Sequence, residues 1–365
     1  MNHPTGLYLH IPFCAGKCPY CDFYSVNADE RSIDRYVNAL CKSIEHYGTM
    51  LNRKADTVYF GGGTPSLIGA KRLSAVKAAA EEFFGFDNAE ITVEVNPSKQ
   101  DFDFELLHKN GFNRISIGLQ SANDNELHLL GRQHDIRQAD RCITSAQAAG
   151  FDNISLDLMI ATPQQTKDSL MRSIEFCAEH NVQHISAYLL KVEEGTPYCQ
   201  IRSSLNLPND DEQAEMYLFA CEKLTEYGFH QYEISNFSKP GFESRHNLKY
   251  WHDEEYLGLG PSAHSFVNGK RFYYERSFDA FYSGKTVDDG TGGDTEEWIL
   301  LGLRLSEGIQ NSRFKERFHT DIPKKYFERA KSLEKIGLVT VSNEHISLTE
   351  KGFLVSNAVI AQILD

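Results

Sequence analysis

The chain has 365 residues, which is enough for one large domain with a substantial core and a smaller appendage. Its 37 Lys and Arg residues are outnumbered by 51 Asp and Glu residues, a formal charge of −14, so we expect no nucleic-acid partner. No apolar run approaches the length of about 20 residues that a membrane span requires, and a strand predicted to start at Leu7 leaves no room for a signal peptide. We therefore expect a cytoplasmic protein without an integral membrane segment.

The first predicted element is a short strand over residues 7–11, ended by Pro12. Three cysteines follow it with the spacing C-x3-C-x2-C, at Cys14, Cys18 and Cys21. A structural zinc usually takes four ligands, whereas three cysteines leave one iron of a [4Fe–4S] cluster open to a small ligand. A zinc ion that borrows a distant histidine and unrelated buried thiols are the alternatives. The confinement of the three cysteines to one loop after a strand favours the cluster.

The other five cysteines are scattered along the chain and fall mostly in predicted helices. We expect them to be reduced core thiols. They are Cys41, Cys142, Cys177, Cys199 and Cys221.

A second motif follows the next predicted strand. Residues 32–47 have helical spacing with Ser32 as the expected N-cap, and residues 57–60 are a predicted buried strand. The sequence GGGTPS at residues 61–66 comes next, and then a helix over residues 70–84. Glycines here permit a close backbone approach, and free N–H groups in such a turn form a nest for a carboxylate or another polar ligand. Taken alone, the motif is equally compatible with a simple tight turn.

Strands and helices then alternate along the chain, which predicts βα units and a parallel sheet. The further strands are expected at residues 89–95, 114–119, 153–158 and 184–190, and helices at 102–110, 136–149 and 166–178. In parallel barrels, ligand-binding groups gather at the carboxyl ends of the strands. The cysteine loop, the glycine turn, Glu94, Gln120 and Asp157 are all predicted to lie there.

A helix over residues 210–227 and a strand over 229–234 precede an unusual segment at residues 244–252. This segment contains His246, Asn247, Tyr250 and Trp251. Imidazole is a common axial ligand of haem iron, and flat aromatic rings pack well on a porphyrin. The alternative is a core-packing segment whose histidine is hydrogen-bonded within the protein.

Residues 288–294 are small and polar and are the clearest predicted linker. Beyond it, helices are expected at residues 295–305, 314–318, 326–336 and 353–364, with a hairpin at 338–341 and 346–349. We therefore divide the chain into residues 1–285 and a C-terminal winged-helix-like α+β domain, residues 295–365. Without a basic stripe, this domain is expected to be a lid or docking module.

The motifs resemble the radical S-adenosylmethionine (SAM) superfamily and, within it, the family of oxygen-independent coproporphyrinogen III dehydrogenase. The resemblance rests on HIPFCAGKCPYC, GGGTPS, ITVEVNP, IGLQS and LGLRLSEGI. It implies an α/β fold with a partial (β/α)6 barrel, a [4Fe–4S] cluster on Cys14, Cys18 and Cys21, and bound SAM. The implied SAM-binding residues are Tyr8, Gly62, Gly63, Thr64, Glu94, Gln120, Arg132 and Asp157. Among them, Arg132 would pair with the methionine carboxylate, and Glu94 and Gln120 would bind the ribose hydroxyls.

Two features depart from the dehydrogenase pattern. Phe23 stands where that family has a fourth cysteine, and the first strand begins too early for the family's N-terminal extension. The H-N-x-x-Y-W segment instead resembles the haem-chaperone branch, which implies that His246 holds haem.

We therefore predict a chaperone that binds the cluster, SAM and haem and passes haem to an acceptor protein, such as a respiratory enzyme. Radical decarboxylation of coproporphyrinogen III is the alternative, and a radical SAM oxidation of an unrelated substrate is a weaker one. Whether the chain is an enzyme, and whether two copies form a homodimer, stay open.

Overall fold

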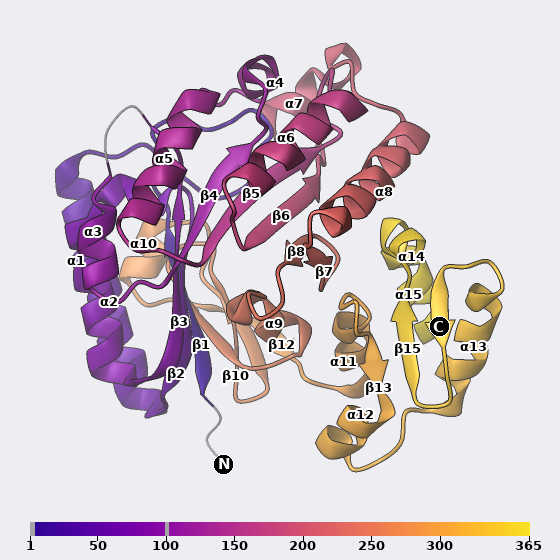
Figure 1. Cartoon of the computed structure of the whole chain (residues 1–365). Coiled ribbons are helices and arrows are strands. Elements are labelled where there is room, and N and C mark those ends of the chain that lie inside the picture. Colours follow the sequence, from indigo (N-terminus) through magenta and orange to yellow (C-terminus); the bar gives the residue numbers. More distant parts are fainter. Residues whose placement is uncertain (1–3, 99–101) are drawn as a thin grey trace.

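A partly open barrel of parallel strands forms the centre of the molecule (Figure 1). The structure is a computed structural model that describes residues 4–98 and 102–365. Six neighbouring strands pair in parallel in chain order. They are β1 (Thr5–Ile11), β2 (Ala55–Gly62), β3 (Phe86–Val95), β4 (Arg114–Gln120), β5 (Ile154–Ile160) and β6 (His184–Leu189).

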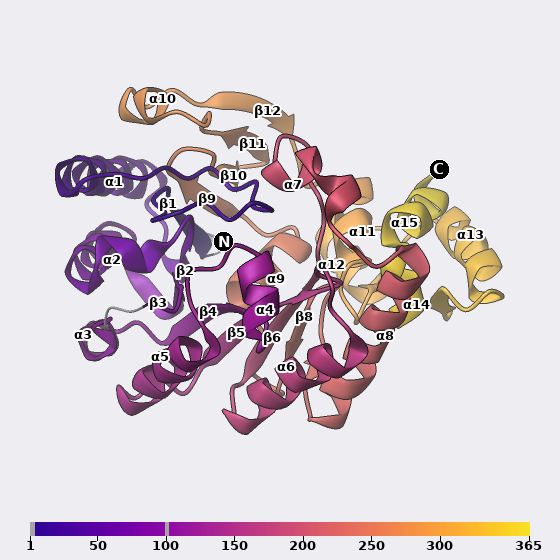
Figure 2. The same ribbon diagram turned by 90° about the horizontal axis from the view of Figure 1, so that it is seen from above.

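Helices connect these strands and cover the outer face of the sheet (Figure 2). Most of them begin at a side-chain cap, which satisfies backbone N–H groups that have no partner within the helix. Asp135 and Thr166 form capping boxes at the starts of α5 and α6. The connecting helices are α1 (Glu30–Leu51), η1 (Pro65–Ile68), α2 (Ala70–Phe84), α3 (Phe104–Lys109), α4 (Asp124–Leu129), α5 (Ile136–Ala148) and α6 (Lys167–Glu179).

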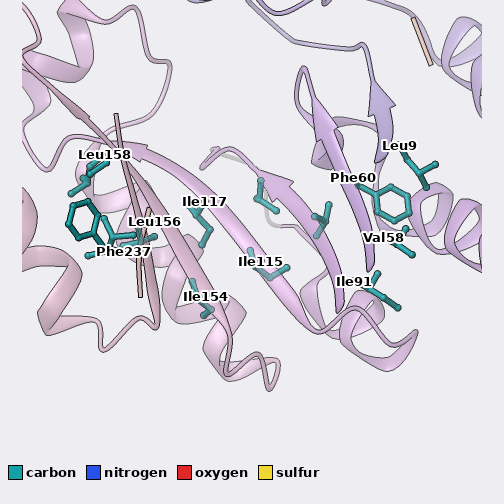
Figure 3. Packing of buried hydrophobic residues seen from close by; sticks show 14 of the residues in the cluster. Leu9, Val58, Phe60, Ile91, Ile115, Ile117, Ile154, Leu156, Leu158 and Phe237 are labelled. Carbon is teal, nitrogen blue, oxygen red and sulfur yellow. The ribbon is translucent and has the colours of Figure 1, made fainter. Parts of the chain in front are cut away.

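The strands alternate between an apolar face under the helices and a polar face inside the barrel. On β4, Ile115 and Ile117 belong to the large hydrophobic cluster, together with Val58, Ile154 and Leu156 of other strands (Figure 3). Burying each of these side chains contributes about 1.5–3 kcal/mol to folding. The inner positions are therefore left to polar residues, and they form the site described below.

Further strands extend the sheet at both edges. Beyond β1 lie β9 (Tyr256–Leu259), β10 (His264–Val267), β11 (Lys270–Tyr273) and β12 (Val287–Thr291), and beyond β6 lie β8 (Asn236–Ser238) and β7 (His230–Gln231). The remaining helices of this part are α7 (Pro197–Gln200), η2 (Arg202–Ser204), α8 (Asp210–Glu226), α9 (Arg245–Trp251) and α10 (Phe278–Tyr282). Among them, α9 contacts β2.

The C-terminal residues form helices around a small antiparallel sheet beside the barrel (Figure 1). Its strands are β13 (Ile309–Gln310), β15 (His345–Leu348) and β14 (Val339–Val341), in that spatial order. The helices are α11 (Thr295–Gly302), α12 (Asn311–Phe318), α13 (Lys324–Glu334), α14 (Glu350–Leu354) and α15 (Ser356–Leu364). A backbone bridge between Glu233 and Leu305 joins this part to the barrel.

The predicted fold class is confirmed, and most predicted elements are present within a few residues of their expected bounds. Cys199, which we expected to be a core thiol, is exposed. Four predictions about caps and elements were also wrong. Asp29, not Ser32, caps α1, and its side chain accepts a hydrogen bond from the Ser32 amide. The predicted linker contains β12, because residues 287–291 pair with β11.

The other two errors concern strands. The strand expected at 229–234 shrinks to β7, and β5 runs on to Ile160, so Asp157 lies in mid-strand. The division at residues 285 and 295 stays a prediction. In the described part of the chain, every helix is too short or too polar to cross a bilayer.

Candidate functional site

A cavity of about 1130 Å³ lies inside the barrel. Ten of the twelve predicted site residues line it, although they come from distant parts of the sequence. These ten are Cys14, Cys18, Cys21, Gly62, Gly63, Thr64, Glu94, Gln120, Arg132 and Asp157. Tyr8 and His246 are the exceptions, and they lie behind the wall of the cavity.

The cysteine loop stands at the carboxyl ends of the strands. Its base is held by β-type pairing of Phe13 with Val26 and by a hydrogen bond from the Cys14 amide to the Val26 carbonyl oxygen. All three cysteines are free thiols that are partly exposed to solvent. Burial raises the pKa of the Cys21 thiol, and the neighbouring Cys18 and Cys14 raise it further. A cationic centre would remove this mutual repulsion, because metal ions bind thiolates and not thiols.

The donor set fits an iron–sulfur cluster better than a single metal ion. Within residues 4–98 and 102–365, His, Cys, Asp and Glu side chains do not gather in threes closely enough to hold one ion. The three thiols are therefore spread around the cavity mouth and do not converge on one point. Arg132 lies within 3.8 Å of the Cys18 sulfur through Nη1, so a positive charge already faces this loop.

The glycine turn after β2 is built into the base of the cysteine loop. The Gly63 amide donates to the Ile11 carbonyl oxygen, and the Thr64 amide donates to the Phe13 carbonyl oxygen. A Cβ on Gly63 would lie 2.5 Å from the Phe13 oxygen, so only glycine permits this approach. The amides of the turn are thus occupied by the protein itself, and the expected nest of free N–H groups is not formed by Gly62, Gly63 and Thr64.

Glu94 connects this turn to the barrel interior. Its carboxylate accepts hydrogen bonds from the Tyr59 hydroxyl at 2.9 Å and from the Gly62 amide at 3.2 Å. Burial, together with the charge of Asp157, raises the pKa of Glu94 to about 7. Burial also raises the pKa of Asp157 to about 6, although Ser116 donates a hydrogen bond to it at 3.1 Å. The pKa values of both acids therefore lie close to neutral pH.

Arg132 is fixed in the cavity wall by neutral acceptors. Its Nη2 donates to Asn96 Oδ1 at 2.7 Å and to the Gly118 carbonyl oxygen at 2.8 Å. Asn96 in turn donates to the Thr64 hydroxyl at 2.9 Å, which links Arg132 to the glycine turn. Gln120 ends β4 nearby with a left-handed backbone, φ 69°. The guanidinium of Arg132 is thus oriented by neutral groups, and none of the carboxylates in the described part of the chain forms a hydrogen bond with it.

His246 does not reach the cavity in this structure. It is 1% exposed, and its two ring nitrogens lie 2.8 Å from the Thr57 hydroxyl and 2.7 Å from the Tyr250 hydroxyl. Its ring stacks at 5.2 Å on Tyr59, and Tyr8 lies 6.4 Å away on the same side. Burial lowers the pKa of His246 to about 3, so the imidazole is neutral at physiological pH. The next residue, Asn247, does line the cavity.

Several cavity residues were missed by the sequence analysis. They include Arg114, Ser116, Ser186 and Tyr188, which occupy inner positions of β4 and β6. The period-two placement of polar residues along Arg114-Ile115-Ser116-Ile117 was the signal that could have found the first two. Phe23 also lines the cavity and is 68% exposed, so an apolar ring stands where the dehydrogenase pattern has a cysteine.

Comparisons with known proteins show the family of the chain. The model of the radical SAM superfamily matches residues 8–177, and that of the HemN C-terminal domain matches residues 294–355. The heme chaperone HemW of Lactococcus lactis is 34% identical over 375 residues, covering 100% of this chain and 98% of that protein. HemW of Bacillus subtilis is also 34% identical, over 98% of each chain.

Among solved structures, coproporphyrinogen III oxidase (HemN) from Escherichia coli matches with a TM-score of 0.85. The match covers 99% of this chain and 90% of that one, at 23% identity. At this level of identity the likeness concerns the fold alone.

Proposed function

The chain belongs to the heme chaperone HemW family of the radical SAM superfamily, and from this premise we propose that it binds haem, a [4Fe–4S] cluster and SAM and transfers haem to an acceptor protein. The observation that carries the proposal is one cavity that is lined by three thiols, two half-buried acids and an oriented arginine. A mere tight turn or a set of unrelated thiols would not bring these groups together.

In the proposed cofactor site, several residues that line the cavity have separate roles. Cys14, Cys18 and Cys21 would hold the cluster, whose chemistry when bound would be one-electron reduction of SAM. Arg132 would orient a carboxylate, because its guanidinium is fixed by Asn96 and carries no ion pair with an acid of the described residues. Glu94 fixes the positions of Tyr59 and the glycine turn by accepting a hydrogen bond from each. These residues position ligands and shield them from water.

Haem is assigned to His246 at the other end of the barrel. A neutral imidazole is the form that ligates iron, and burial keeps His246 neutral at physiological pH. Its Nε2 is occupied by Tyr250, so haem binding through this atom requires that hydrogen bond to open. Asn247 marks the place where the same helix already borders the cavity.

The acceptor is proposed to be a protein such as a respiratory enzyme, and the cytoplasm is the proposed location. Pairing of two copies of the chain is a further proposal, which size-exclusion chromatography tests. Phe23 at the cavity mouth supports the chaperone over the dehydrogenase, because it offers no fourth thiol.

The deciding experiment combines two variants of α9 with an activity assay. Anaerobically purified protein with reconstituted cluster is titrated with haem and incubated with coproporphyrinogen III. Haem binding near one per chain without formation of protoporphyrinogen supports the chaperone, whereas clear turnover supports the dehydrogenase. His246→Ala should lose haem while retaining iron and SAM binding. His252→Ala, at the end of the same helix, is the matched control. Unchanged haem binding by His246→Ala would remove His246 as the ligand.

The cluster assignment has its own test. Replacing Cys14, Cys18 and Cys21 by alanine should abolish bound iron and the visible absorption of the cluster. Replacing Cys142 and Cys177, which lie in α5 and α6, should leave both unchanged. Iron retained by the triple variant would contradict the assignment.

A further inference from the structure

Arg114 is a buried cation inside the barrel that none of the roles above uses. It is the first residue of β4, and its side chain lies on the inner face together with those of Ser116 and Gln120, while Ile115 and Ile117 pack outward (Figure 3). The side chain is 2% exposed and lines the cavity. It is also the largest of the fully buried side chains.

The guanidinium has no anionic partner in the described part of the chain. Its Nε has no hydrogen-bond partner, and no carboxylate of residues 4–98 or 102–365 forms an ion pair with it within 4.0 Å. Burying a charge without a partner costs several kcal/mol, so such groups are normally paired. An arginine also cannot avoid this cost by losing its proton.

The two acids whose pKa the charge of Arg114 lowers accept hydrogen bonds from other groups. Glu94 accepts hydrogen bonds from Tyr59 and Gly62, and Asp157 accepts one from Ser116. The charge of Arg114 lowers the pKa of both acids, but burial outweighs it and both pKa values remain raised. Within residues 4–98 and 102–365, carboxylates therefore act on Arg114 through their charge and form no ion pair with it.

The position of Arg114 separates it from the cofactor end. Arg132 binds the carbonyl of Gly118, four residues further along β4. At about 3.3 Å per residue, the backbone of Arg114 lies about 13 Å from that of Gly118 along the strand, toward the start of β4. A group bound at Arg114 is thus remote from the cysteine loop and close to the end of the barrel where α9 lies, since the charge of Arg114 also acts on His246.

We propose that Arg114 is a carboxylate-binding residue at the inner end of the cavity. A planar guanidinium with free hydrogen-bond donors can bind a carboxylate through two parallel hydrogen bonds. The identity of the ligand rests on the proposed function: the propionates of haem and the methionyl group of SAM both supply a carboxylate. The depth of Arg114 and its place near α9 favour the propionate.

The test compares each ligand with a form that lacks the carboxylate. Wild-type protein and Arg114→Met are titrated with haem, haem dimethyl ester, SAM and decarboxylated SAM. The variant should bind the acidic ligand about 10- to 100-fold more weakly, because a hydrogen-bonded charge pair is lost. Arg114→Met should bind the carboxylate-free form with the same affinity as the wild type. A loss of affinity that depends on the carboxylate separates recognition of that group from a general structural effect of the substitution.

Two further variants complete the experiment. Arg114→Lys keeps the charge but loses the planar fork, and its affinity should be intermediate. Lys77→Met removes a buried cation from α2, outside the cavity, and should leave all four affinities unchanged. Thermal unfolding checks that each variant is folded.

The outcomes are distinct. A loss confined to haem identifies the propionate, and a loss confined to SAM identifies the methionyl carboxylate; either supports the proposal. Equal affinity of wild type and Arg114→Met for both acidic ligands overturns it while the proposed function stands. If Arg114→Met does not fold, the wild-type protein alone decides. Equal wild-type affinity for haem and its dimethyl ester, and for SAM and decarboxylated SAM, then overturns the proposal. Wild-type protein that binds neither haem nor SAM overturns the proposed function and the carboxylate site together.

Discussion

Replacement of Glu94 by glutamine keeps the shape of this half-buried side chain and removes its titration. Burial and Asp157 raise the pKa of Glu94 from 4.5 to about 7. That rise corresponds to about 3.4 kcal/mol in favour of the neutral acid in the folded protein. Because the folded state keeps a proton that the unfolded chain has released, wild-type stability falls as pH rises from about 4.5 to about 7. Glu94→Gln lacks this pH-dependent contribution to the free energy of unfolding.

The comparison is made by urea unfolding of reduced, cluster-free protein, followed by the fluorescence of Trp251 and Trp298. Between pH 5 and pH 8 the wild type should lose about 2.5 kcal/mol of unfolding free energy relative to Glu94→Gln. Glu105→Gln, which removes an exposed carboxylate on α3, should follow the wild type. Parallel pH profiles for wild type and Glu94→Gln would refute the electrostatic description of the cavity.

Three further predictions concern the glycine turn and the surroundings of His246. Gly63→Ala places a Cβ 2.5 Å from the Phe13 carbonyl oxygen, so it should cost about 1–3 kcal/mol and reduce iron retention; a wild-type melting temperature and iron content would contradict this. Glu90→Ala removes the carboxylate that accepts hydrogen bonds from the first two amides of α9, at 3.1 and 3.0 Å, and should cost about 2–4 kcal/mol in urea unfolding. Glu90→Gln should cost less, and equal losses would mean that the carboxylate charge is unimportant. Tyr250→Phe removes the hydroxyl on His246 Nε2, so haem titration should show about fivefold tighter binding; weaker binding would argue against Nε2 as the ligand atom.

The sequence predicted the parts of this site whose positions follow from local rules. The spacing of the three cysteines confines them to one loop, and the glycine turn must follow a strand. Parallel strands then bring their carboxyl ends together, which places Glu94 and Gln120 beside both motifs. Each of these steps needs only the order and type of neighbouring elements, and the cavity brings the resulting residues together.

The remainder depended on contacts between distant segments. Thr57 and His246 are 189 residues apart, and their hydrogen bond is one reason why the histidine is buried and not open to a ligand. The turn amides are occupied because the carbonyls of Ile11 and Phe13 lie against them, which no pattern within the turn indicates. The polar segment at residues 287–291 became a strand because the exposed edge of β11 was free to pair.

Tyr59 is shared between the two halves of the site. Its hydroxyl donates to Glu94 beside the glycine turn, and its ring forms the face on which His246 stacks. A ligand that displaces this ring must therefore change the free energy needed to expose the histidine. Thermodynamic linkage is reciprocal, so occupancy of His246 would alter affinity at the glycine turn by the same factor. Under the proposed function, Tyr59 therefore couples the affinity for the cofactor to the affinity for haem.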